Sequence, residues 1–396
     1  MGTRPRPGPR APMGSWEPGL RVLAGGALAL ALAVAGCAAG APARPAVGRA
    51  RHPIPVASSA TGLRLSRAQG VEAPPGFRVQ VEASGLGHPT AMAYGPDGRL
   101  YVAESSGAIV VAVPGSRRPL DFAAGFPSPQ GLVWLGHTLY VAAQGQVDRV
   151  VLVRGRAARR VRVIGGLPHG LHHQNALIRG PDGRLLIASG STCNLCREPT
   201  ANAAAVLSLL PSGRGLRRVA TGLADPVGLA VQPGTGRLYA TVDGQAGLGS
   251  MANPEPADML VRVLPGGWYG WPGCWPDARL LVMQGSCRGV TTPAAFLGPH
   301  AGAAGIAFYT GTSFPPGYRG NLFVAEWGEA RSTAGPGRRV ARIVLGRDGT
   351  AAISDVSVFA QGLAHPIAVL VDPRGALLVL DWGRGVIYRI QADAAP

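Results

Sequence analysis

The clearest pattern in the chain is a short polar turn followed by an apolar run, and it occurs six times. The run is rich in Leu, Tyr, Val and Ala and suits a pleated, half-buried strand, whereas the Gly and Pro residues before it suit a tight turn. Each copy therefore predicts a turn that leads into a β-strand. The copies are 95–103, 136–142, 180–188, 236–240, 320–325 and 372–380.

A second element, a Gly-Leu loop followed by an apolar stretch, precedes most copies, as at 85–92, 222–229 and 362–369. The Leu residue of each copy recurs at intervals of 39 to 55 residues, apart from one interval of 84 after Leu238. One four-stranded propeller blade takes roughly 40 to 50 residues. The pattern predicts an all-β, six-bladed propeller of four-stranded blades with an insertion in the long interval. A β-sandwich pair is the alternative, but sandwiches seldom repeat internally.

A propeller needs a device that closes its ring, because an open blade leaves exposed strand edges. The segment 77–82 alternates apolar and polar residues, as an outer strand should, and lies just before the first blade. We expect it to complete the last blade beside 386–390.

The amino terminus has the features of a bacterial lipoprotein signal. Residues 20–36 are apolar, follow an Arg-bearing start and end in small residues before Cys37, whose thiol would receive the lipid. An ordinary secretory signal with a chance Cys is the alternative, and a membrane-spanning anchor is disfavoured because the run is shorter than about 20 residues. We expect a signal peptide at 1–36, a disordered tether at 37–70 and the propeller at 71–394, held by lipid outside the cytoplasmic membrane on the periplasmic or extracellular face.

Apart from Cys37 the chain has four cysteines, an even number in a chain expected to be exported. The simplest pairing joins Cys193 to Cys196 and Cys274 to Cys287, so that each disulfide closes one loop. The first pair alone also resembles part of a zinc site or a redox couple. Zinc requires four suitably spaced ligands and a thioredoxin-like site requires a strand-to-helix setting, so we favour a structural role.

The formal charge is +17, and every basic residue is Arg, because the chain contains no Lys. The arginines are scattered along the sequence instead of forming a stripe, which gives little support to nucleic-acid binding. Attraction to anionic envelope polymers or lipids stays open. The absence of Lys excludes Schiff-base chemistry on a lysine.

Titratable chemistry is concentrated in the loop 168–177, which contains His169, His172, His173 and Asn175 immediately before an expected inner strand. A His near neutral pKa can remove a proton from an alcohol, and an amide can orient a polar ligand. Loops of a propeller converge at one mouth of its central channel, where ligands usually bind. Taken alone, each His is more often an ordinary residue of a surface loop than a catalytic one.

Several segments resemble the glucose/sorbosone dehydrogenase family, the soluble six-bladed quinoprotein sugar dehydrogenases, over roughly 75–390. The matching segments are 172–185, 190–196, 221–230, 266–272, 300–309, 323–328 and 385–390.

The resemblance implies oxidation of an aldose or related polyol with pyrroloquinoline quinone (PQQ), a calcium ion at the cofactor, and transfer of electrons to an acceptor. It aligns His172 with the family's general base, with His173 as the one-residue alternative, and the calcium-binding main-chain carbonyls with Gly244 and Gln245. Asp243 would hold that loop or serve as an ordinary turn residue. The residues expected to contact PQQ, which bears three carboxylates, are Asn175, His300, Arg331 and Arg384.

The chain also departs from the family pattern. Ala224-Asp225 replaces an Arg-Asn pair, so that a cation is lost and an anion stands near the expected quinone, and the lysine near the cofactor is absent. Two alternatives therefore remain. One is a propeller that binds a carbohydrate, cell-wall fragment or protein without turnover, and the other is a metal-dependent lactonase-type hydrolase. The hydrolase would need several converging carboxylates, whereas Asp97, Asp182 and Asp372 are expected in turns.

Overall fold

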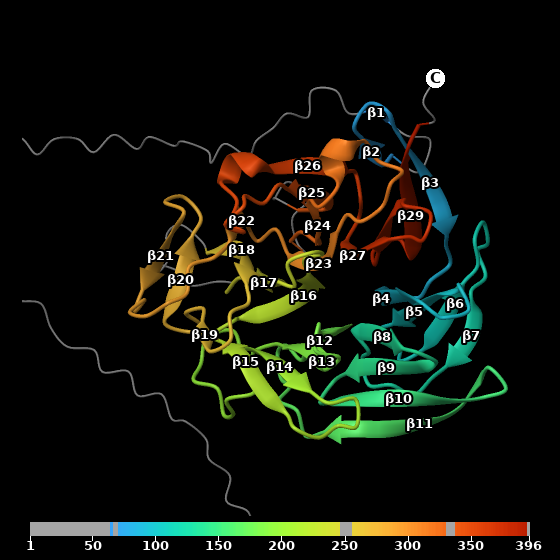
Figure 1. Ribbon diagram of the computed structural model, residues 1–396, viewed down its shortest axis with the longest axis horizontal. Helices are drawn as coiled ribbons and strands as arrows, with labels where there is room; N and C mark the ends of the chain where they lie inside the picture. The colour runs from blue at the N-terminus through green and yellow to red at the C-terminus, as the bar shows by residue number, and fades with distance from the viewer. Residues whose placement is uncertain (1–63, 66–69, 246–255, 330–336, 394–396) are drawn as a thin grey trace, which may run out of the picture. The chain divides into compact units, whose positions relative to one another are not determined.

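The computed structural model describes residues 64–65, 70–245, 256–329 and 337–393, and nearly all of its regular elements are β-strands. Two short 3-10 turns, η2 (Pro316–Tyr318) and η3 (Ile353–Asp355), are the exceptions among these residues. In the same ranges no helix has the length and apolarity that a membrane span requires. The strands form six blades of a propeller (Figure 1), which confirms the predicted fold class.

Each of the first three blades is an antiparallel sheet whose strands follow one another in chain order from the channel outward. Blade 1 consists of β4 (Pro89–Tyr94), β5 (Leu100–Glu104), β6 (Ile109–Ala112) and β7 (Leu120–Ala123). Blade 2 consists of β8 (Gly131–Leu135), β9 (Thr138–Ala143), β10 (Gln146–Val153) and β11 (Arg156–Gly165). Blade 3 consists of β12 (Gln174–Arg179), β13 (Leu185–Ser189), β14 (Ala205–Leu209) and β15 (Arg217–Thr221).

The last three blades keep this order. In blade 4 an insertion separates the third strand from the fourth, and blades 5 and 6 include strands from the amino-terminal part of the chain. Blade 4 consists of β16 (Asp225–Val231), β17 (Leu238–Asp243), β18 (Ala257–Arg262) and β22 (Ala295–Pro299). Blade 5 consists of β23 (Ala303–Phe308), β24 (Leu322–Glu326), β25 (Arg339–Ile343) and β26 (Val356–Gln361), extended at its outer edge by β2 (Glu72–Ala73) and β1 (Arg64–Leu65). Blade 6 consists of β27 (Pro366–Val371), β28 (Leu377–Asp381), β29 (Val386–Ala392) and β3 (Phe77–Ala83).

The ring closes as the sequence predicts. Strand β3 pairs antiparallel with β29, with Val79 opposite Ile390. The buried Arg389 of β29 donates from Nε to Glu82 at 2.6 Å and from Nη1 to Asp372. An ion pair thus joins residues separated by 307 positions in the chain and fastens the two ends of the propeller.

The repeated turns also form as expected. The Asp97 carboxylate accepts hydrogen bonds from the backbone NH of Arg99 at 3.1 Å and from the Tyr101 hydroxyl at 2.8 Å. Asp182 and Asp372 accept backbone NH groups two residues later in the same way. These three carboxylates stabilise the turns that join the first two strands of their blades, and the Leu that follows each turn is buried.

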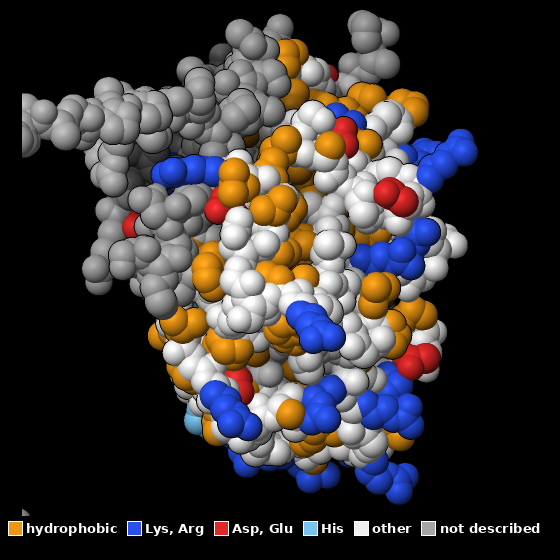
Figure 2. Space-filling view, turned by 90° about the vertical axis from the view of Figure 1, so that its left-hand side faces the viewer, with side chains coloured by type: hydrophobic (Ala, Val, Ile, Leu, Met, Phe, Trp, Pro, Cys, Tyr) orange, Lys and Arg blue, Asp and Glu red, His pale blue; other side chains and the backbone are white. Residues whose placement is uncertain are grey.

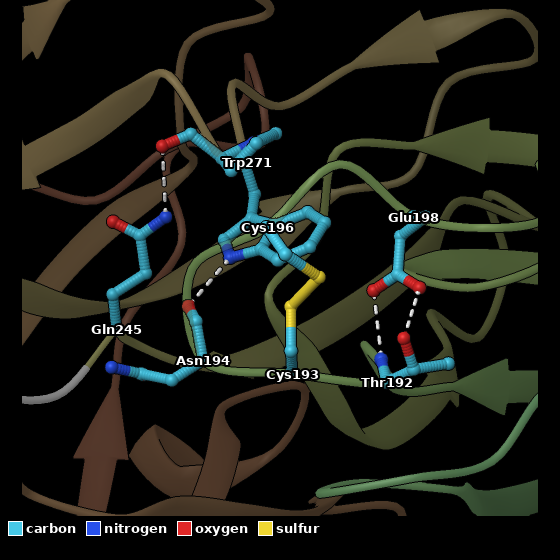
Figure 3. Close-up of a disulfide and its surroundings, with 8 residues drawn as sticks. Thr192, Cys193, Asn194, Cys196, Glu198, Gln245 and Trp271 are labelled. Atoms are coloured by element: carbon cyan, nitrogen blue, oxygen red, sulfur yellow. Dashed lines mark hydrogen bonds between the residues drawn. A yellow bond between two sulfur atoms is a disulfide. The ribbon is translucent and has the colours of Figure 1, made fainter. Parts of the chain in front are cut away.

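The long interval contains the predicted insertion, which lies between β18 and β22. Its first strand, β19 (Gly267–Trp268), pairs with β15 of blade 3, and β20 (Cys274–Asp277) and β21 (Val282–Gly285) form a hairpin. Disulfides join Cys274 to Cys287 and Cys193 to Cys196, confirming the predicted pairing. The Trp271 indole donates to the Asn194 carbonyl at 3.2 Å, so the insertion contacts the second disulfide loop (Figure 3).

The six first strands surround a central channel. They contact one another in the order β4, β8, β12, β16, β23, β27 and back to β4. The channel is a cavity of about 800 Å³ lined by these strands, largely with aliphatic side chains. We call the end at which these strands begin the mouth. The loops before the first strands and the loops that join second to third strands both lie there.

Candidate functional site

The predicted base, His172, pairs with a carboxylate of the next blade. Its Nδ1 lies 3.0 Å from Oδ2 of Asp225, the first residue of β16. Asn175 donates from Nδ2 to Oδ1 of Asp225 at 2.8 Å and to the Pro226 carbonyl at 3.0 Å, and it also lines the channel. His172 is therefore held at the mouth by a short hydrogen-bonded group that begins in the channel wall.

Backbone contacts explain why this group forms. The His172 NH donates to the Ser191 carbonyl at 3.1 Å, and the Gly190 NH donates to the His173 carbonyl at 2.9 Å. A Cβ atom at Gly190 would lie 2.5 Å from Cβ of His172 and 2.4 Å from Oδ1 of Asp225. Only glycine leaves room for the histidine and the carboxylate to meet.

The environment of His172 favours a base with one defined tautomer. Because Asp225 accepts at Nδ1, the proton of the neutral ring lies on Nδ1 and Nε2 keeps its lone pair. Burial, the largest single influence, lowers the pKa of His172, but the charge and hydrogen bond of Asp225 together with the charge of Glu198 outweigh it and raise the pKa above its ordinary value. The imidazole keeps 28% of its side-chain surface exposed, so a substrate hydroxyl can reach it.

The alternative base, His173, is engaged on both ring nitrogens. Its Nδ1 lies 3.2 Å from the Gln174 carbonyl and its Nε2 lies 3.4 Å from Oγ of Ser128. Burial lowers the pKa of the His173 imidazole. This geometry favours His172 over His173 for proton removal.

A second group of oxygen atoms lies at the ends of β17 and β18. Asp258 accepts hydrogen bonds from the Gly244 NH at 2.9 Å and the Ala303 NH at 2.8 Å, and its carboxyl interacts electrostatically with that of Asp243. Burial raises the pKa of both carboxyl groups, and the charge of Asp243 raises that of Asp258 further. Gln245 donates from Nε2 to the Pro272 carbonyl at 3.1 Å, and its buried Oε1 has no partner among the described residues (Figure 3).

These oxygen atoms fit a hard divalent cation. Calcium prefers carboxylate and carbonyl oxygens, and a buried Oε1 without a donor is the kind of ligand that such an ion takes. The loop is the one in which Gly244 and Gln245 were expected to bind calcium. Its continuation at 246–255 lies outside the described residues.

The expected cofactor residues are divided among three blades. Arg384 lies in the loop between β28 and β29, is exposed, and donates from Nη1 to the Tyr388 hydroxyl at 3.1 Å. His300 lies just before β23 with a φ of 51°, and Arg331 lies outside the described residues.

Arg338, which the sequence did not single out, follows that segment at the mouth. It donates from Nη2 to the Glu329 carbonyl at 3.2 Å, and its buried Nε has no partner in the described chain. The guanidinium groups of Arg338 and Arg384 are of the chemical kind that binds carboxylates.

The structure also assembles an aromatic rim that sequence reasoning missed, formed by His88, Trp327, His365 and Trp382. The rings of Trp327 and His365 stack with centroids 3.9 Å apart, and those of His88 and Trp382 are 4.4 Å apart. A signal for it exists in the repeats, because His88, Asp225 and His365 all stand immediately before a Pro at the start of a first strand. Residues at that position contact side chains at the mouth: His88 packs on Trp382, Asp225 bonds to His172, and His365 stacks on Trp327.

Asp225, which the sequence places as an anion near the expected quinone, has two partners in the structure. Its carboxylate bonds to His172 and to Asn175. Its charge is thus used to orient the histidine.

One further cluster of potential metal ligands, among the residues that the structure describes, consists of Cys193, Cys196 and Glu198. The two cysteines are joined in a disulfide, and Glu198 accepts from the Thr192 NH at 2.7 Å and from its hydroxyl at 2.6 Å (Figure 3). The cluster stabilises the loop beside His172.

Comparison with known proteins agrees with this picture. The profile of the family "Glucose / Sorbosone dehydrogenase" matches residues 166–381. The calcium structure of the carbohydrate-active enzyme of family AA12 from Trichoderma reesei is 16% identical with a TM-score of 0.71, covering 84% of this chain and 100% of that chain. The PQQ-bound aldose sugar dehydrogenase from Streptomyces coelicolor is 22% identical with a TM-score of 0.61, covering 81% and 100%. An uncharacterized protein of Borreliella burgdorferi is 21% identical over 350 residues, 81% of this chain and 90% of the relative.

Proposed function

The chain belongs to the glucose/sorbosone dehydrogenase family, and from this premise we propose that it is a PQQ-dependent dehydrogenase that oxidises an aldose or related polyol at the mouth of the channel. The observation that carries the proposal is the pair formed by His172 and Asp225, in which Nδ1 is bonded and Nε2 of the imidazole has no hydrogen-bond partner among the described residues. Two further observations support it: one structural neighbour is a PQQ-bound aldose sugar dehydrogenase, and His172, Asn175 and Asp225 are in contact with one another at the mouth.

In the proposed reaction Nε2 of His172 removes the proton of the substrate hydroxyl while the carbon that bears it loses a hydride, leaving a carbonyl product. Asp225 fixes the ring orientation and stabilises the imidazolium that forms, and Asn175 holds Asp225 in place. When bound, PQQ supplies the two-electron acceptor, with calcium polarising its quinone oxygen. Gln245 and the loop at Asp243 would hold the calcium, and Arg338 and Arg384 would bind the cofactor carboxylates.

The aromatic rim supports a sugar as substrate, because the apolar faces of sugar rings pack on aromatic side chains. Its members come from blades 1, 5 and 6, whereas His172 belongs to blade 3. A substrate over the channel can therefore contact aromatic rings on one side and the base on the other.

We further propose export and lipid attachment through Cys37, which would place the enzyme in the cell envelope with an electron acceptor nearby. This rests on the signal-like segment at 20–36. Mass spectrometry of the protein recovered from membranes of a bacterial host tests it: a diacylglyceryl group on an amino-terminal Cys37 is expected, and an unmodified thiol would contradict it.

The enzyme assay begins with apoprotein, to which calcium and PQQ are added before dye reduction is followed with a panel of aldoses and polyols. Cofactor binding is measured separately by its absorbance change. His172→Gln should bind PQQ like the parent but lose turnover, and His137→Gln, an exposed histidine in a repeat turn, is the matched control. Binding with unchanged turnover in His172→Gln would reject the base, whereas the absence of saturable PQQ binding would reject the cofactor.

A second candidate, a propeller that binds a carbohydrate, cell-wall fragment or protein without turnover, is favoured by one observation. Ala224 stands where the family commonly has an arginine, so one cation for the cofactor is lost. If the apoprotein fails to bind PQQ but retains affinity for a sugar or glycan in calorimetry, this candidate replaces the first.

A further inference from the structure

Charge is distributed very unequally among the blades. Residues 131–222, which form blades 2 and 3, contain twelve arginines and three carboxylates, whereas the rest of the span 77–393 contains 17 arginines and 16 carboxylates. These twelve arginines lie in one continuous stretch of the sequence that forms two adjacent blades, so the arginines are less evenly scattered over the folded protein than expected. Basic side chains gather at the lower end of Figure 2, the end at which β11 and β15 lie in Figure 1.

The arginines lie on a continuous outer surface. Strand β11 is the outer edge of blade 2, and four of its ten residues are exposed arginines. The turn of blade 3 reaches this edge, since a Cβ atom at Gly213 would lie 2.1 Å from the Val163 carbonyl oxygen. Asp148 offsets part of the charge, at 3.7 Å from Arg160 and 4.0 Å from Arg162.

Exposed aliphatic side chains accompany the arginines at the turns that join third to fourth strands. In blade 2 Val153 is 56% exposed beside Arg154 and Arg156, and in blade 3 Leu210 is 40% exposed near Arg214. Blade 1 repeats the arrangement, with Leu120 55% exposed after two exposed arginines at 117 and 118. These turns contain no Asp or Glu, although Asp121 follows the first of them. We call the three turns, 113–120, 153–156 and 210–214, the basic edge.

Strand direction places the ends of third strands away from the mouth. First strands begin at the mouth, so second strands end there and third strands begin there. Third strands therefore end at the opposite face. Gln146 at the start of β10 follows Gly145, whose NH bonds to Gln174 at the mouth at 2.7 Å, whereas Val153 ends the same strand seven residues after Gln146. The turn of blade 2 therefore lies away from the mouth, whereas the turn of blade 1 approaches the loop before β4, since a Cβ atom at Gly85 would lie 2.1 Å from the Arg117 carbonyl oxygen.

We propose that the basic edge is a docking surface for an anionic phospholipid membrane. Arginine binds phosphodiester groups bidentately, and cationic residues flanking exposed aliphatic side chains are the composition of interfacial membrane contacts. A nucleic acid would need a groove or stacking aromatics, and a soluble polyanion would make no use of Val153 and Leu210.

The test is sedimentation of the full chain, carrying Cys37→Ser to prevent acylation, with vesicles of phosphatidylcholine alone or with phosphatidylglycerol. Arg154→Gln/Arg156→Gln/Arg214→Gln should lower the partition coefficient on anionic vesicles at least thirtyfold, from the contribution of each arginine at such a surface. The control is a charge-matched variant with three exposed arginines replaced elsewhere, Arg288→Gln/Arg319→Gln/Arg347→Gln, which should lower it less than threefold.

A second variant distinguishes a bilayer from a soluble polyanion. Val153→Ser/Leu210→Ser should weaken binding to anionic vesicles several-fold and leave binding to soluble polyphosphate unchanged, and hydrogen exchange at 153–156 and 210–214 should slow when vesicles are added. Equal loss of vesicle binding in the test and control triple variants would overturn the proposal. Vesicle binding that is unchanged by the Ser substitutions would also overturn the proposal and would identify a soluble polyanion as the partner.

Discussion

Replacing Asp225 by Asn removes the charge behind His172 while preserving size. The amide can still bond to Nδ1, but its NH2 group can donate as readily as its oxygen accepts. When it donates, the imidazole proton moves to Nε2, the atom that must accept the substrate proton. The substitution therefore removes both the charge that raises the His172 pKa and the tautomer that the proposed reaction requires.

The magnitude follows from the role of a general base. Positioned proton transfer contributes about 10²- to 10⁴-fold to a rate, so kcat of Asp225→Asn should fall by a factor in this range. The base acts in its neutral form, and activity is lost as pH falls through its pKa. Because Asp225 raises that pKa, its removal should also move the acidic limb of the kcat/KM profile to lower pH.

The assay is dye reduction between pH 5 and 9 with PQQ and calcium saturating, beside a PQQ titration of each variant. Asp182→Asn, which alters a turn carboxylate in blade 3, is the control and should keep the parental profile. Turnover within threefold of the parent, or an acidic limb that does not move, would refute the reasoning. Loss of PQQ binding in Asp225→Asn would instead assign the carboxylate to the cofactor.

The same pair should affect stability in a pH-dependent way. A raised pKa means that the folded protein binds the His172 proton more tightly than the unfolded chain does. This stabilisation is complete below the unfolded pKa of about 6.5 and is lost as pH rises through the higher folded value. The difference between parent and Asp225→Asn in free energy of unfolding by urea should thus be larger at pH 5.5 than at pH 8.5, and a difference that grows with pH would contradict the pairing.

Three further predictions concern other parts of the structure. Gly190→Ala should separate His172 from Asp225, because the added Cβ atom would occupy the space between them. Its kcat should fall about as much as that of Asp225→Asn, with PQQ affinity unchanged. An unchanged kcat would show that the site tolerates a Cβ atom. Arg389→Met removes the cation shared by Glu82 and Asp372 at the ring closure and should cost about 3–5 kcal/mol of unfolding free energy. Arg99→Met, in an exposed pair, should cost less than about 1 kcal/mol, and equal costs would show that the Arg389 ion pair does not stabilise the closure. Arg384→Ala should weaken PQQ binding about ten- to a hundredfold in an absorbance titration, the value of one charge-assisted hydrogen bond, and an unchanged Kd would exclude that contact.

The fold could be predicted because its signals are local and repeated. A turn and the strand after it occupy about ten consecutive residues, and six copies at blade spacing specify a ring. The alternation at 77–82 was sufficient to identify the closing strand, since an outer strand shows one face to water. The four cysteines paired with near neighbours, so their arrangement was also accessible.

The site was less accessible, because its bonds join residues far apart in the chain. Asn175 and Asp225 are 50 positions apart, and Asp258 binds the Ala303 NH 45 positions away. No spacing rule links such residues; only the ring brings them together. The one usable signal is the position just before a Pro at the start of a first strand, which Asp225 shares with His88 and His365.

The most direct test of the central claim is a crystal structure of the protein with calcium, PQQ and a sugar that the assay identifies as a substrate. The proposed function predicts that the cofactor lies across the mouth, that Arg384 contacts one of its carboxylates, and that the reacting hydroxyl is within hydrogen-bond range of Nε2 of His172. A cofactor bound elsewhere, or a sugar at the mouth whose hydroxyl groups lie beyond the reach of that nitrogen, would contradict it.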